Sequence, residues 1–87
     1  MKAIVTVIGK DMVGILAKAS TSCANSNANV MDVTQSILQD YFAMVMLIDG
    51  TNMNCSLKEL KERMKRDLPQ MEIHVMHEDI FNSMHRI

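Results

Sequence analysis

Aromatic side chains and excess charge are both scarce in this chain. Its 87 residues include two Phe, one Tyr and no Trp, and nine Lys and Arg face ten Asp and Glu. Proteins that bind nucleic acids typically offer a basic surface and aromatic rings on which bases stack. The sequence therefore gives no indication of a nucleic-acid interface.

Long apolar runs and cysteines are also rare. No run is long enough to span a bilayer, and Met1-Lys2-Ala3-Ile4 leads into a strand pattern without the layout of a signal peptide. The only cysteines, Cys23 and Cys55, fit reduced thiols better than a disulfide framework. We expect a cytoplasmic protein that does not interact with membranes.

The length indicates one domain over residues 1–87, without linkers or repeats. A domain this small has a narrow margin of stability, and oligomerisation is a common remedy. The ten methionines are explained either as core filler or as an adaptable surface for partners.

Hydrophobic periodicity predicts four strands and two helices in the order β-α-β-β-α-β. The strands are expected over 3–8, 30–38, 41–48 and 71–75, and the helices over 13–24 and 57–68, with a short helical extension over 77–87. This order predicts an α+β, ferredoxin-like fold with a four-stranded antiparallel sheet and both helices on one face. Right-handed crossovers favour the strand order 4-1-3-2, in which the second strand is an edge that a second copy could extend.

Spacing also predicts which side chains share a face. The first helix should bury Leu16, Ala19, Ser20 and Cys23, and the second should bury Leu57, Leu60, Met64 and Leu68. Ser56 and Glu59 match a capping box, and Pro69 ends that helix. The second strand alternates, with Met31, Val33 and Ile37 on one side. A terminal stripe of Phe81, Met84 and Ile87 either closes the open end of the core or docks on another subunit.

The segment from Gly9 to Leu16 joins a strand to a helix through a short polar loop. Helix starts expose unpaired N–H groups and a partial positive charge, which suit a carboxylate. Gly14 lacks a Cβ, so a ligand or a second chain could approach its backbone closely. The alternative is a tight turn that needs two glycines for its own geometry.

The element order, this glycine loop, Ala28-Asn29-Val30 and the ending from His77 to Ile87 together resemble an ACT domain. The chain looks most like the small stand-alone bacterial ACT proteins. The resemblance implies a regulatory module without catalytic activity. It also implies a homodimer that binds a small effector, often an amino acid, between its subunits.

The resemblance implies an effector site in the loop and at the start of the second strand, often from the partner chain. The residues are Lys10, Asp11, Met12, Val13, Gly14, Ile15, Leu16 and Asn29. Asp11 could receive an ammonium, and the Asn29 amide could both donate and accept. Otherwise Asp11 caps the first helix, Asn29 shapes a turn, and Lys10 is simply exposed. Some serine-binding relatives have His and Asn in this loop, where Lys10 and Asp11 stand here, so the ligand stays open.

Other clusters give weaker signals. His74 and His77 lie three apart, and positions three apart along a strand point to opposite faces, with Glu78 following and His85 on the terminal helix. No spacing typical of a metal site is present. Cys23 is expected to be buried and inert, and Cys55 has no obvious base near it in sequence. The charges from Lys58 to Arg66, with Glu62 and Arg66 spaced i, i+4, indicate a solvated helix face. We expect no metal, no cofactor and no catalytic residue.

Three functions remain open from the sequence. The first is a homodimeric module that binds an amino acid near Gly14 and Asn29 and whose state a partner protein reads. The second is an interaction module that dimerises without a ligand. The third is a small enzyme on the same scaffold, which fold alone does not exclude.

Overall fold

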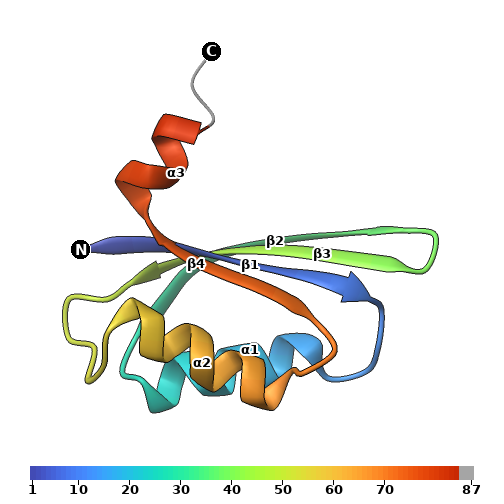
Figure 1. Cartoon of the computed structure of the whole chain (residues 1–87), viewed down its shortest axis with the longest axis horizontal. Coiled ribbons are helices and arrows are strands. Elements are labelled where there is room, and N and C mark those ends of the chain that lie inside the picture. Colours follow the sequence, from blue (N-terminus) through green and yellow to red (C-terminus); the bar gives the residue numbers. More distant parts are fainter. Residues whose placement is uncertain (85–87) are drawn as a thin grey trace.

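The computed structural model describes residues 1–84 and shows the predicted order of strands and helices (Figure 1). The elements are β1 (Lys2–Lys10), α1 (Ile15–Asn25), β2 (Asn29–Leu38), β3 (Tyr41–Asp49), α2 (Leu57–Asp67), β4 (Glu72–His77) and α3 (Glu78–Met84). The predicted boundaries are correct to within about two residues. His85, Arg86 and Ile87, assigned above to the terminal helix, lie outside the described residues.

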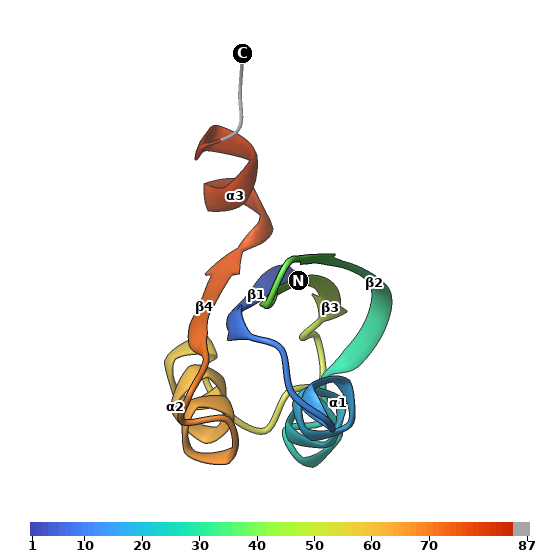
Figure 2. The ribbon, with the colours of Figure 1, turned by 90° about the vertical axis from the view of Figure 1, so that its right-hand side faces the viewer.

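The four strands form one antiparallel sheet in the order β2-β3-β1-β4. Helices α1 and α2 cover one face of it, side by side (Figures 1 and 2). The ferredoxin-like fold and the predicted strand order are therefore confirmed. Central β1 pairs with β3 and β4, and Val5 lies opposite Met46 on one side and Val75 on the other.

The core lies between the sheet and the two helices. Its fully buried side chains include Val5 and Val7 of β1 and Leu60 of α2. Four methionines are also fully buried: Met44, Met46, Met64 and Met71. For these four, the reading as core filler is confirmed, because flexible thioethers fill the irregular space between a twisted sheet and two helices.

The ends of the helices follow local chemistry. The Ser56 hydroxyl accepts from the Glu59 N–H at 3.1 Å, and the Ser56 N–H lies 3.5 Å from the Glu59 carboxylate, so the predicted capping box is present. After α1, Asn27 adopts a left-handed φ of 57° and its amide donates to the Asn52 carbonyl at 2.7 Å. Asn tolerates this conformation, which ends the helix.

The buried face of α1 differs from the prediction. It consists of Ile15, Ala19, Ser22 and Cys23, whereas Leu16 is 42 % exposed. The helix begins at Ile15, so the residues spaced four, seven and eight positions later line up with it rather than with Leu16. Cys23 is buried as expected, and burial raises the pKa of its thiol to about 11.

Strand β2 is more exposed than its alternating pattern predicts. A β-bulge between Val30 and Asp32 removes Met31 from the regular pairing, and Met31 is 47 % exposed. Ile37, near the far end, is 61 % exposed. Only Val30 and Val33 of this strand pack against the core. The outer edge of the sheet is thus thinly covered.

Helix α3 lies on the other side of the sheet from α1 and α2 (Figures 1 and 2). It therefore does not close the end of the core, and that alternative is wrong for its described part. Ile80 and Met84 are 55 % and 64 % exposed. Within residues 1–84, none of the helices has both the length and the apolar character needed to cross a membrane.

The core predicts a contrast between two neighbouring residues of α2. Replacing the fully buried Leu60 by Ala should lower the free energy of unfolding by about 2–5 kcal/mol, because it leaves a cavity. The exposed neighbour Lys61 serves as control. Lys61→Ala should change the free energy of unfolding by less than about 0.5 kcal/mol. Urea denaturation measures both, and equal effects would contradict the packing described.

Candidate ligand site at the β1–α1 loop

The loop between β1 and α1 lies beside the turn that joins β2 to β3. Lys10, the last residue of β1, pairs with Tyr41 at the start of β3. The Asp11 N–H donates to the Asp40 carbonyl at 2.8 Å. Loop and turn together form one end of the molecule, at the right of Figure 1.

Gly14 is the N-cap of α1 and adopts a left-handed conformation, with φ 90° and ψ 7°. Apart from its chain neighbours, no described residue has an atom within 4 Å of the position that a Cβ would take. The glycine is therefore required by its backbone angle and not by crowding. Its backbone is open to a ligand from that side.

The start of α1 lacks a side-chain cap. In the described chain, no side chain bonds to its first N–H groups and no acidic residue lies in the first turn. The interpretation of Asp11 as the helix cap is therefore wrong, because Gly14 occupies that position. The uncapped N–H groups and the positive end of the helix dipole suit an anion.

Apolar side chains surround this end of the molecule without being covered. Val13 is 95 % exposed, and Leu38 and Tyr41 across the turn are 75 % and 64 % exposed. Met12 packs partly against the core, and Ile15 is buried beneath the helix start. Lys10 and Asp11 are exposed. The loop thus combines charged side chains, open backbone and an apolar rim.

Asn29 does not join the loop within one chain. It begins β2 opposite Asp49, whereas the loop lies beyond the other end of that strand, near Leu38. At about 3.3 Å per residue, the two ends of β2 are roughly 30 Å apart. One chain therefore brings residues 10–16 together and leaves exposed Asn29 at the opposite end.

The histidines of β4 are divided between the two faces of the sheet. His74 pairs with Thr6 and His77 with Ala3, which confirms their opposite orientation. The His74 Nε2 lies 3.3 Å from the Glu72 carboxylate, and the His77 Nδ1 lies 3.6 Å from that of Asp79. In residues 1–84, no three His, Cys, Asp or Glu gather closely enough to hold a metal ion.

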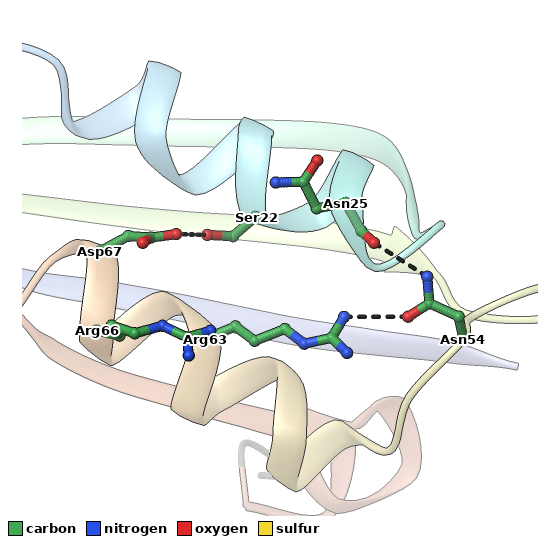
Figure 3. A pocket seen from close by; sticks show the side chains of 6 residues that line it. All are labelled: Ser22, Asn25, Asn54, Arg63, Arg66 and Asp67. Carbon is green, nitrogen blue, oxygen red and sulfur yellow. Dashed lines mark hydrogen bonds between the residues drawn. The ribbon is translucent and has the colours of Figure 1, made fainter.

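Sequence reasoning missed a polar groove between α1 and α2. It encloses about 410 Å³ and is lined by Ser22, Asn25, Asn54, Arg63, Arg66 and Asp67 (Figure 3). The charges of α2 indicated only a solvated face. The one signal available was the i, i+3 spacing of Arg63 and Arg66, which places both on one side of the helix.

Comparison with known proteins agrees with the fold. Residues 2–78 match the model of the ACT domain. The chain belongs to the ACT domain family. A UPF0237 protein of Clostridium perfringens is 44 % identical over 89 residues, covering all of both chains.

Two solved structures have a fold similar to that of this ACT domain. An ACT domain protein from Streptococcus pneumoniae superposes with a TM-score of 0.77 at 30 % identity and covers 93 % of each chain. The regulatory subunit of aspartate kinase from Thermus thermophilus matches 86 % of this chain and 50 % of its own, with a TM-score of 0.66 and 20 % identity. The second likeness concerns the fold alone.

The left-handed angle at Gly14 predicts a graded response to substitution. Gly14→Ala should destabilise the fold by about 1–2 kcal/mol, because an L-residue is strained at this φ. Gly14→Asn should cost less, since Asn tolerates the left-handed region. Thermal or urea unfolding distinguishes them, and an Asn variant less stable than the Ala variant would contradict this explanation.

Proposed function

We propose that the chain is a non-catalytic, cytoplasmic regulatory module that binds an amino acid at a homodimer interface. The observation that carries this proposal is the uncapped, left-handed start of α1 at Gly14, where open backbone meets an anion-favouring helix end. The backbone would hold the ligand α-carboxylate, and Asp11 would receive the ammonium. Lys10, Met12, Val13, Ile15 and Leu16 would form the surrounding wall.

The edge of the sheet supports a shared site. Within residues 1–84, strand β2 pairs only with β3, so its outer hydrogen-bonding groups are open to a second chain. In an antiparallel pair of β2 strands, the start of one strand lies beside the end of the other. The partner's Asn29 would then approach Leu38 and the adjacent loop, which the same chain's Asn29 does not reach.

Uncovered apolar groups support dimerisation at the same place. Leu16, Ile37 and Leu38 are all exposed in the single chain although they are strongly apolar. A second subunit would remove this surface from water, which stabilises a small domain. Binding would couple two subunits, and a partner protein would read the change in their packing.

The description of one neighbour in fold is in keeping with a regulatory role. The Thermus thermophilus relative in fold is described as the regulatory subunit of aspartate kinase. For the present chain, regulation would act on another protein or on its own assembly. The identity of the bound amino acid would depend on Lys10 and Asp11, which are exposed in the same loop.

A second candidate function is that of an interaction module without a ligand. It is favoured by α3, whose Ile80 and Met84 are exposed on the side of the sheet that α1 and α2 leave uncovered. Such a module would dimerise or dock through apolar contacts and would not respond to amino acids.

A ligand panel distinguishes the two functions. Each of the twenty amino acids is added at millimolar concentration and the unfolding temperature is recorded. A ligand at about 100 times its dissociation constant adds roughly 2.7 kcal/mol. For a domain of this size the expected shift is about ten degrees or more. A shift by one amino acid, lost in Asp11→Ala and kept in Lys58→Ala, supports the module; a flat panel contradicts it.

Mixing two variants tests the shared site. Asp11→Ala and Asn29→Ala should each abolish binding of the amino acid found in the panel. In an equal mixture that has exchanged its subunits, half of the dimers contain one copy of each variant. Each of these mixed dimers has one intact site out of two, so about a quarter of all sites should bind.

The matched control mixes either variant with the double variant Asp11→Ala/Asn29→Ala, which forms no intact site. Light scattering at micromolar concentration should show dimers throughout. A mixture that binds no better than this control, or a protein that is monomeric, would contradict a site shared between two chains.

A further inference from the structure

The groove between α1 and α2 lies apart from the β1–α1 loop. Ser22 and Asn25 lie in the C-terminal half of α1, whereas the loop precedes its first residue. Arg63, Arg66 and Asp67 come from α2. Its volume of about 410 Å³ is in the range of small-molecule pockets.

Hydrogen bonds hold the walls of the groove in place. The Ser22 hydroxyl, on a side chain that is 2 % exposed, donates to the Asp67 carboxylate at 2.8 Å. The Asn54 amide donates to the Asn25 carbonyl at 3.0 Å. The first bond ties α1 to α2, and the second ties α1 to the segment that precedes α2 (Figure 3). A ligand would therefore meet Ser22, Asp67 and Asn54 already positioned.

Both arginines lack an acidic partner in the described part of the chain. One nitrogen of Arg63 donates to the Ser26 hydroxyl at 2.9 Å and to the Asn54 amide oxygen at 3.0 Å, which are neutral acceptors. Neither arginine takes part in an ion pair there, so Glu62 and Arg66 do not meet despite their spacing. Asp67 instead faces Ser22.

Unused guanidinium donors beside polar groups define the ligand chemistry. Arginine offers planar, paired N–H groups that match a carboxylate. Two arginines and one aspartate leave one net positive charge on the groove, which suits a single negative charge. The Asp67 carboxylate and the Asn25 amide can bond hydroxyl groups of the same molecule.

We propose that the α1–α2 groove binds a small hydroxylated monocarboxylate. The Arg66 guanidinium holds the carboxylate, assisted by the free nitrogens of Arg63, and Asp67 accepts from a ligand hydroxyl. Because it uses no residue of the loop and no second subunit, this site is independent of the amino-acid site proposed above.

The test is an NMR titration of the full nitrogen-15-labelled chain with glycerate and with gluconate. Glycerol at matched ionic strength is the uncharged control. Both acids should shift the amide signals of Ser22, Asn25, Asn54 and Arg63, and glycerol should not. Arg66→Gln should weaken binding about tenfold or more, since a charge-assisted hydrogen bond is lost.

A variant of the same helix separates specific binding from general attraction. Lys58→Gln removes the same charge from α2 outside the groove and should leave the titration unchanged. An equal loss in Lys58→Gln, shifts located elsewhere, or no response to either acid would overturn the proposal. Asp11→Ala should not affect these titrations, and Arg66→Gln should not affect the response to an amino acid, so the two sites fail separately.

Discussion

The pairing of β1 on both sides is the constraint on which the remaining structure depends. Its hydrogen bonds to β3 and β4 hold three strands in register, and Ala3, Val5 and Val7 point from it into the core. Where this strand ends, the chain must turn toward α1, so the register of β1 with β3 also determines where the loop lies. The position of Gly14 is thus a consequence of sheet pairing, although the residue itself belongs to a helix end.

Periodicity in the sequence was sufficient for the strand order and for the buried stripe of α2, because long elements with one apolar face have few ways to pack. It was insufficient for α1, which begins two residues later than predicted and buries Ile15 instead of Leu16. The bulge at Met31 and the direction of α3 depend on tertiary contacts that no local pattern encodes.

The loop was foreseeable from its glycines and from the family resemblance, which also implied that the residue of the second strand often comes from the partner chain. The structure adds that the loop and Asn29 of one chain lie at opposite ends of β2. The groove escaped prediction for another reason. Its character depends on which partner each side chain selects, and Asp67 turns to Ser22 although Arg63 stands one helical turn before it.

The two places described along α1 differ in how they could change over evolution. The groove consists of side chains, so any single substitution alters its chemistry. The loop offers backbone instead, and the left-handed angle at position 14 restricts that position to glycine or, at some cost, asparagine. In the amino-acid site proposed above, the backbone at position 14 would hold the carboxylate, whereas Lys10 and Asp11 would meet the rest of the ligand. The place of the carboxylate and the preference for one amino acid would then be inherited from different positions of the chain.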